Sequence, residues 1–318
     1  MSPTPDHVLD DRSANIHYSW DRSIDPVLTV DPGDVIRFEC RDATDGQLGP
    51  DSTPKDVERL EFQAHPLTGP VEIDGLEVGD TLVIDIISLE HHGIGYTYFY
   101  PGSEGKGLLP DEFDEPGLHV WDLDATTGSF VNGIEVPLVP FPGNLGVPPA
   151  DPGSHSTVPP RTVGGNLDIK HLTAGSRLSL PVAVDGGLFS VGDCHAAQGD
   201  GEVCITGIEA PMDVTIRLEA RSDLDLSAPR FRTDGPFSPS GGDEPMVATA
   251  GVADDLMLAT KSAVRGMLDY LDAERGLTRT EAYLLCSVAV DLKINEVVDA
   301  PNWVVSAYLP ERLFPDGS

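Results

Sequence analysis

The chain repeats one short unit, in which a Gly-Asp turn leads directly into a run of apolar residues. Pro32-Gly33-Asp34 precedes an apolar run at residues 35–40, and Val78-Gly79-Asp80 precedes another at residues 81–87. Glycine supplies the backbone freedom that a tight turn needs, and short runs rich in β-branched residues favour strands. Many short strands joined by turns bury their apolar faces best against each other, so we expect a β-sandwich or barrel.

Other segments fill in this β-rich part. Further strands are expected at residues 26–30, 69–73 and 177–182, with residues 26–30 and 35–40 forming a hairpin. Residues 96–160 are rich in glycine and proline, which predicts loops and short strands over the β-core, including a lid over a substrate. A second loop is expected at residues 222–245, where Gly235, Pro236, Gly241 and Gly242 gather.

The last third of the chain changes character. Residues 214–220 alternate as a half-buried strand, and residues 254–274 carry apolar side chains at helical spacing, with Gly276 as the C-cap. Thr278 and Glu281 form a capping-box pattern that starts a second helix, and residues 303–309 form a closing strand. We therefore predict an α+β, mainly β protein: a sandwich- or barrel-like domain at 1–200 with most of the site motifs, and at 201–318 an α+β domain of strands plus a helix pair.

The balance of charge is strongly acidic. Asp and Glu number 53 against 20 Lys and Arg, a net charge of -33, which would repel nucleic-acid phosphates. Because 40% of the residues are hydrophobic, a folded chain is expected, and dispersed acids with few lysines are typical of halophilic proteins. The absence of a long apolar run, of a leader-like N-terminus and of a CxxC pair predicts a cytoplasmic, membrane-free protein with reduced thiols.

One segment concentrates polar chemistry between glycines, from Gly192 to Glu202. Alternate side chains of a strand share a face, so Asp193 and His195 are expected to point the same way and Cys194 the opposite way. The glycine-rich turn that follows would return Gln198, Asp200 and Glu202 towards them. Carboxylates combined with imidazole bind divalent metals or carry out acid–base chemistry.

This segment resembles the signature of the acetamidase/formamidase family. Gly164-Gly165-Asn166-Leu167-Asp168 is similar to the family's Gly-Gly-Asn-x-Asp block, and His65-Pro66-Leu67-Thr68-Gly69-Pro70 to its His-x-x-(Ser/Thr)-Gly-Pro block. Residues 30–34, 155–161 and 248–302 are also similar. The resemblance implies an amide hydrolase that acts on short-chain, formamide- or acetamide-like amides and releases ammonia and a carboxylate. It also implies a homo-oligomer, for which a dimer is expected.

The resemblance and the local chemistry together nominate site residues. The expected ligands of a divalent metal are His65, Asp193 and His195. The expected catalytic residues, which act with a metal-activated water, are Glu202, Asp168 and Gln198. The expected substrate-binding carboxamides are Asn166 and Gln198. Zinc is favoured for mixed imidazole and carboxylate donors, while an oxygen-rich subset accepts calcium or magnesium. Asp200, between two glycines, is expected to stabilise a turn.

Three alternatives remain at this point. Cys194 as a nucleophile is disfavoured by the strand alternation that turns it from His195. Ser52-x-x-Lys55 has the spacing of a serine–lysine pair, but Pro54 disfavours the turn that would join them. The third is a non-catalytic β-sandwich binding module with a structural metal, although only 6% of residues are aromatic and sugar sites use aromatic faces. Ammonia release from formamide separates this module from an amidase.

The acidity leads to a prediction about salt. At about 1 M salt the Debye length falls to about 3 Å, so the mutual repulsion of the carboxylates is screened. We expect the melting temperature, followed by circular dichroism, to rise as potassium chloride increases from low concentration to molar concentration. A melting temperature that stays flat or falls over this range would contradict the halophilic interpretation.

Overall fold

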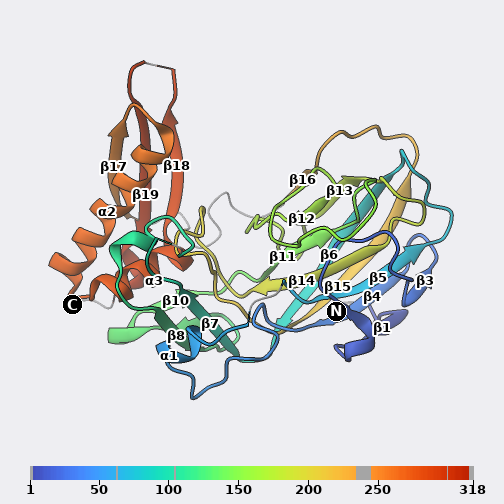
Figure 1. The fold of residues 1–318 in the computed structure, drawn as a ribbon, viewed down its shortest axis with the longest axis horizontal. Coiled ribbons are helices and arrows are strands. Elements are labelled where there is room, and N and C mark those ends of the chain that lie inside the picture. Colours follow the sequence, from blue (N-terminus) through green and yellow to red (C-terminus); the bar gives the residue numbers. More distant parts are fainter. Residues whose placement is uncertain (1–2, 62–63, 104, 234–244, 299, 315–318) are drawn as a thin grey trace.

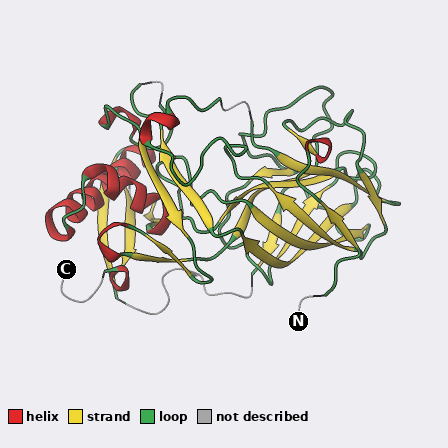
Figure 2. Ribbon diagram, turned by 90° about the horizontal axis from the view of Figure 1, so that it is seen from below, coloured by secondary structure: helices red, strands yellow, loops and turns green. Residues whose placement is uncertain are grey.

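The computed structural model describes residues 3–61, 64–103, 105–233, 245–298 and 300–314. Figure 1 shows two lobes, one made of layered strands near the N-terminus and one that carries the helices and the C-terminus. In the view of Figure 2 the strands of the first lobe stack in layers, while the helices gather at the other end of the molecule. Among the residues described here, no helix combines the length and the apolarity needed to cross a membrane.

The larger lobe is built on two sheets. The first has the strand order β1 (His7–Leu9), β4 (Val35–Cys40), β15 (Met212–Arg221), β6 (Thr81–His91), β13 (Arg177–Pro181) and β16 (Arg230–Arg232). The second has the order β12 (Gly164–Asn166), β11 (Phe141–Gly146), β14 (Phe189–His195), β5 (Leu67–Ile73) and β2 (Ile16–His17), with β3 (Leu28–Val30) also paired to β5. This arrangement confirms the predicted mainly-β fold class.

Apolar side chains hold the two sheets together. The ring of Phe38 on β4 packs edge-on against Phe189 on β14, with the ring centroids 5.9 Å apart. The thiol of Cys40 donates to the carbonyl oxygen of Val191, 3.7 Å away in the other sheet. Each fully buried large side chain contributes about 1.5–3 kcal/mol to folding, so these contacts stabilise β14, which ends in the site.

The second lobe carries the helices. Its main sheet has the order β17 (Met246–Ala253), β19 (Trp303–Pro310) and β18 (Asp291–Glu296), and it packs against α2 (Leu256–Arg275) and α3 (Arg279–Ala289). Gly251 permits the close approach of α2 to β17, because a Cβ there would lie 1.9 Å from the carbonyl oxygen of Ala259. The remaining elements are the ribbons β7 (Ile94–Phe99) with β8 (Gly117–Asp122) and β9 (Thr127–Ser129) with β10 (Glu135–Pro137), and the short helix α1 (Pro54–Val57).

The helix boundaries follow the sequence signals. Gly276 ends α2 in the left-handed region at φ 66°, where glycine is favoured. Thr278 begins α3: its hydroxyl accepts from the backbone N–H of Glu281, and the Glu281 carboxylate accepts from the backbone N–H of Thr278. The predicted helix pair is therefore confirmed.

Two local predictions are wrong. Residues 26–30 and 35–40 do not form a hairpin, because β3 runs parallel to β5 in one sheet while β4 pairs with β1 and β15 in the other. The turn at Gly33 bonds to the carbonyl oxygen of Leu218, so it carries the chain from one sheet to the other. The expected loop at 222–245 contains β16, which pairs with β13, and its glycine cluster at 234–244 lies outside the described residues.

The expected division after residue 200 stays a prediction. Strand β15 lies beyond that position in the sequence, yet it pairs with β4 and β6 at the centre of the first sheet. Residues on both sides of position 200 therefore build the larger lobe.

The cap of α3 gives a test of the fold. Replacing Thr278 by alanine removes the acceptor of the Glu281 N–H, and we expect the free energy of unfolding to fall by about 1 kcal/mol. Thr260→Ala is the matched control, because the Thr260 hydroxyl only bonds back to the carbonyl oxygen of Leu256 inside α2. Guanidinium unfolding at fixed salt measures both variants, and equal stabilities would contradict the capping role.

Candidate active site

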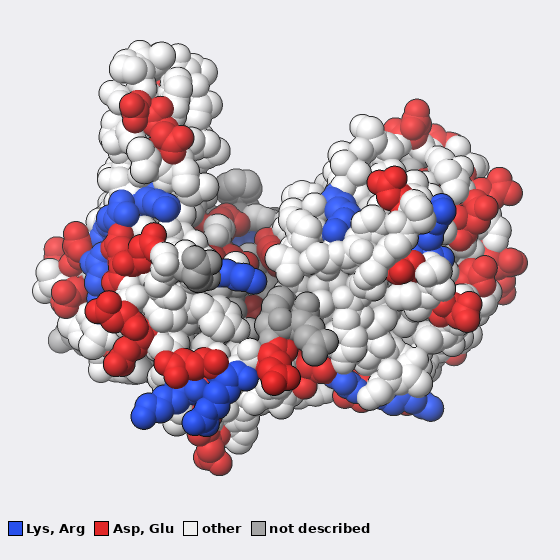
Figure 3. Space-filling view, in the orientation of Figure 1, with Lys and Arg blue, Asp and Glu red and all other residues white. Residues whose placement is uncertain are grey.

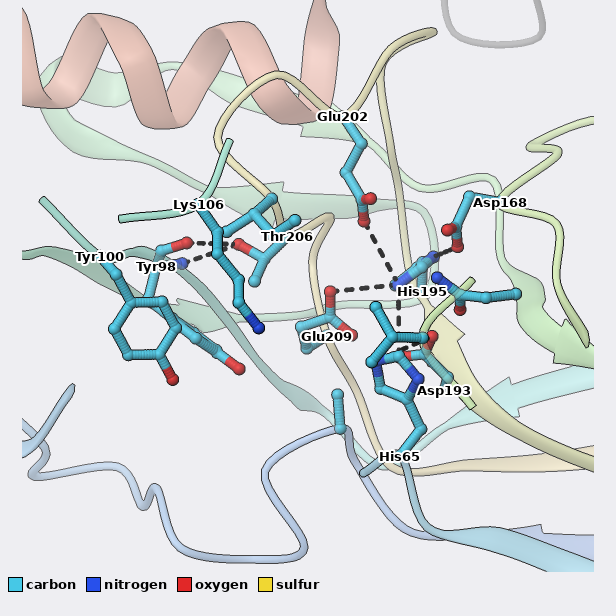
Figure 4. A pocket seen from close by; sticks show the side chains of 14 residues that line it. His65, Tyr98, Tyr100, Lys106, Asp168, Asp193, His195, Glu202, Thr206 and Glu209 are labelled. Atoms are coloured by element: carbon cyan, nitrogen blue, oxygen red, sulfur yellow. Dashed lines mark hydrogen bonds and ion pairs between the residues drawn. The ribbon is translucent and has the colours of Figure 1, made fainter. Parts of the chain in front are cut away.

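A cavity of about 80 Å³ lies where the sandwich meets the β7–β8 ribbon. One side of it is polar, and Figure 4 shows Asp168, Asp193, Glu202 and Glu209 converging there on His195. The other side includes the rings of Tyr98 and Tyr100. Its lining consists of Ala43, His65, Tyr98, Tyr100, Lys106, Val158, Asn166, Asp168, Asp193, His195, Glu202, Ile205, Thr206 and Glu209.

The centre of the polar side is the imidazole of His195, which is 1% exposed. Four carboxylates surround it (Figure 4). Its Nε2 lies 3.1 Å from Glu209 Oε1, 3.7 Å from Glu202 Oε1 and 3.8 Å from Asp193 Oδ1, and its Nδ1 lies 3.9 Å from Asp168 Oδ1. The structure thus brings together three carboxylates that the sequence nominated and one that it did not.

Glu209 is the residue that sequence reasoning missed. The chain turns back after β14, so that Ala196 N–H bonds to Ile208 O and Ala210 N–H bonds to Cys194 O, which sets Glu209 beside His195. The backbone of Glu209 also bonds on its other side to Tyr96 in β7. The sequence does contain a signal for Glu209, which is a single acid between Ile208 and Ala210. An acid within an apolar run is buried only when it has a partner, so this position indicates a buried, partnered carboxylate.

Three of these carboxylates stand on unusual backbone. Asp168, Asp193 and Glu202 have φ angles of 49°, 52° and 42°, in the left-handed region that residues with a Cβ rarely adopt. Each such conformation costs about 1–3 kcal/mol and persists where the surroundings impose it, which is common at functional sites. The alternation that predicted a shared face for Asp193 and His195 is therefore modified locally, yet the two side chains do meet.

A glycine opposite the cluster makes room for it. A Cβ at Gly143 on β11 would lie 2.6 Å from Asp168 Oδ1 and 2.7 Å from His195 Cε1. The carbonyl oxygen of Gly143 also accepts from the N–H groups of Leu167 and Asp168. The loop that carries Asp168 is thus fixed against β11, and its carboxylate fills the space that a side chain would take.

His65 lies next to the cluster. Its Nε2 is 3.8 Å from Asp193 Oδ2, while the Nδ2 amide of Asn144 donates to its Nδ1 at 3.2 Å. His65 stands outside the two groups of converging ligand atoms, Asp168–Asp193–His195 and His195–Glu202–Glu209, so its role as a ligand stays a prediction.

The two carboxamides differ in position. Asn166 lines the cavity, where its Oδ1 accepts from Asn144 at 3.3 Å. Gln198 lies behind Asp168 rather than on the wall, and its Nε2 donates to the carbonyl oxygen of Asp168 at 3.1 Å. The geometry gives Gln198 a part in holding the Asp168 loop, and its contact with substrate stays a prediction.

Burial and mutual repulsion shift the titration of the cluster. Burial raises the pKa of Asp168 to about 7 and that of Glu209 to about 7, and it raises the pKa of Glu202 well above its usual value. Burial acts to lower the pKa of His195, but the charge of Glu209 and the hydrogen bond that the imidazole donates to it outweigh burial and raise that pKa well above its usual value. The cluster therefore holds protons at neutral pH when no cation neutralises it.

The donor set fits a divalent cation. Asp168 Oδ1, His195 Nδ1 and Glu209 Oε2 are buried without a hydrogen-bond partner among the described residues, which is costly unless something else binds them. Carboxylate oxygens and an imidazole nitrogen are ligands of zinc, and of calcium or magnesium where oxygen dominates. Because a bound cation displaces protons from its ligands, its affinity should weaken as the pH falls below about 7.

The alternative nucleophiles are poorly placed. Cys194 is fully buried on the core side of β14, and the neighbouring Cys40 thiol together with burial raises its pKa well above the usual value. A neutral thiol facing the core is a weak nucleophile. Ser52 lies outside α1, which begins at Pro54, and its hydroxyl accepts from the backbone N–H of Gly49.

Fold and site together define a mainly-β protein with a buried carboxylate–imidazole centre suited to metal-assisted or acid–base hydrolysis. A family model described as "Acetamidase/Formamidase family" matches residues 4–153 and 150–316. Formamidase from Methylophilus methylotrophus is 28% identical to the chain and aligns with 96% of this chain and 90% of its own length. The chain belongs to the acetamidase/formamidase family, and as a member it is an amide hydrolase.

Solved structures agree with this assignment. The gamma lactamase from Delftia acidovorans superposes with a TM-score of 0.89 at 26% identity, covering 97% of this chain and 93% of that one. An acetamidase from Bacillus halodurans superposes with a TM-score of 0.67 at 28% identity, covering 95% and 96%. The family resemblance seen in the sequence is therefore confirmed.

The central position of His195 predicts its effect on metal binding. We expect His195→Ala to weaken zinc binding at least about 100-fold, measured by competition with a chromophoric chelator, because it removes the only imidazole of both ligand groups. Cys194→Ser, on the core side of the same strand, is the matched control and should keep zinc affinity within about threefold. The reverse pattern would contradict the assignment of His195 to the metal.

Proposed function

We propose that the protein hydrolyses the carbon–nitrogen bond of short-chain amides with a metal-activated water, releasing ammonia and a carboxylate. One observation carries the proposal: four carboxylates converge on a buried imidazole at one side of a cavity. Membership in the acetamidase/formamidase family supports the same chemistry. A non-catalytic binding module is the weaker proposal, because it explains neither the family membership nor the carboxylates gathered around His195.

The two groups of ligand atoms support the following roles for the site residues. His195 and Asp193 hold the divalent ion, zinc in first place, with Asp168 as the third donor rather than as a catalytic group. Such an ion supplies Lewis acidity, which polarises a carbonyl and brings the pKa of water from 15.7 towards about 7. The carboxamide of Asn166 faces the same space and orients the amide through paired hydrogen bonds.

Glu202 is the proton donor to the departing nitrogen. Its burial raises its pKa well above the usual value, which favours the protonated form that can donate. Water adds its oxygen to the acyl carbon, the carbon–nitrogen bond breaks, and the proton of Glu202 goes to nitrogen as ammonia leaves. Glu209, with a pKa raised to about 7, is matched to accept the proton that the water gives up.

The acyl group is placed on the side of the cavity that carries Tyr98 and Tyr100, and Val158 and Ile205 are also among the lining residues. Figure 4 shows both tyrosine rings away from His195, with Lys106 beside them. Each extra methylene packed against apolar side chains is worth about 1–3 kcal/mol of discrimination. We therefore expect acetamide and propionamide to be better substrates than formamide.

A second candidate substrate class is a cyclic amide. The TM-score of 0.89 to a gamma lactamase exceeds that of 0.67 to an acetamidase, although the sequence identities are similar. Opening a lactam ring yields an amino acid and no ammonia, so the two classes are separated by their products. The expected homo-oligomer, a dimer, stays a prediction for either class.

Ammonia release tests the proposal. We expect zinc-loaded protein to release ammonia from linear amides of one to three carbons, to lose this activity after chelation and to regain it with zinc. A γ-lactam, assayed by amino-acid formation, tests the second class in parallel. Folded protein that binds zinc but cleaves neither linear nor cyclic amides would contradict the proposed function.

A further inference from the structure

A buried lysine lies outside the cavity and between the two lobes. Lys170 is 3% exposed, and it follows Asp168 by two residues. Its ammonium forms an ion pair with Asp291 Oδ1 at the start of β18, and Asp200 Oδ2 lies 3.6 Å away. Lys170 is the only buried lysine among the residues that the structure describes, in a chain with five lysines altogether.

The same ion pairs tie down the loop of Glu202. Asp200 N–H donates to Asp291 Oδ1 at 3.2 Å, and Leu292 N–H donates to the carbonyl oxygen of Asp200 at 3.0 Å. Glycines on both sides of Asp200 permit this approach: a Cβ at Gly199 would lie 2.1 Å from Val290 O, and one at Gly201 would lie 2.6 Å from Leu292 Cδ1. Asp200 is thus more than the turn residue that the sequence predicted.

We propose that Lys170 is a positioning residue. Its ion pairs with Asp291 and Asp200 fix the Asp168 loop, which belongs to the larger lobe, against the Glu202 loop, which is hydrogen-bonded to the lobe that carries the helices. Asp168 Oδ1 lies 3.9 Å from Nδ1 of His195, and Glu202 Oε1 lies 3.7 Å from Nε2 of the same ring. Their separation depends on how the two loops meet. Gln198 joins the loops through one hydrogen bond to the Asp168 carbonyl oxygen, and Lys170 joins them through its ion pairs. The inference rests on the proposed function for its kinetic readout.

Stability alone does not account for a buried ion pair. An apolar pair of similar volume is often as stable as a buried ion pair or more so, because the desolvation of two charges offsets their attraction. An ion pair is directional, however: it fixes where Asp200 and Asp291 lie relative to Lys170. Two catalytic loops from different parts of the chain need their relative position to be fixed, and an ion pair of defined geometry does this.

The test replaces the charges by apolar groups at both ends. Lys170→Met/Asp291→Leu removes both of the fully buried charges, and the remaining partner, Asp200, is 32% exposed to solvent, so the protein should remain folded. We expect kcat to fall at least about tenfold with KM within about threefold, because small misplacements of catalytic groups act on the transition state. Zinc affinity, measured with a chromophoric chelator, should weaken about tenfold.

The control removes a partly exposed ion pair far from the two loops. Arg177→Met/Asp85→Leu breaks a cross-strand pair on the first sheet of the sandwich and should leave kcat and zinc affinity within about twofold of wild type. If the Lys170 double variant does not fold, Asp200→Asn gives the same comparison, with an expected loss of at least about threefold in kcat.

The outcomes separate the two hypotheses. A folded Lys170→Met/Asp291→Leu protein with wild-type kcat and zinc affinity overturns the positioning role and leaves the amidase proposal intact. A wild-type protein that binds zinc but hydrolyses no amide overturns the proposed function. In that case zinc affinity alone decides on Lys170, and an unchanged affinity in the double variant overturns its role.

Discussion

Mutual repulsion among four carboxylates, two buried and two half-buried, around one imidazole is the constraint on which the site depends. Asp168, Asp193, Glu202 and Glu209 all lie within 3.9 Å of a His195 nitrogen in a region from which most water is excluded. Such a group is stable only when protons or a cation neutralise it. The raised pKa values of three of these acids reflect this need for neutralisation. A divalent ion bound by the same carboxylates and the imidazole would neutralise them instead of protons.

The acidity of the chain has two separate origins. The space-filling view in Figure 3 shows carboxylates spread over both lobes, where water and salt screen them. The carboxylates at His195 are instead enclosed, and bulk salt screens them little. Solution conditions that stabilise the whole fold are therefore expected to differ from those that load the site, which depends on pH and on the metal.

The lobes contribute different parts of the same site. Strand β14 brings Asp193 and His195 from the rigid sandwich, whereas Glu209 arrives on the returning segment that also bonds to β7. Asp168 and Glu202 stand on loops with left-handed backbone, held by Gly143 on one side and by the Lys170 ion pairs on the other. Precision in this site comes from these supports rather than from a single element.

Local physics made much of this protein readable from its sequence. The Gly-Asp turns, the alternation in β14 and the Thr278–Glu281 capping box act over a few residues, so strands, helix ends and the Asp193–His195 pair were predicted. The family blocks added Asn166, Asp168 and Glu202. Contacts between distant residues were decided only by the tertiary structure: the assignment of β3 and β4 to different sheets, the burial of Glu209, and the ion pair that joins Lys170 to Asp291, 121 residues away. Their partners are chosen by packing and by the desolvation of charge, which depend on the whole fold and not on neighbouring residues.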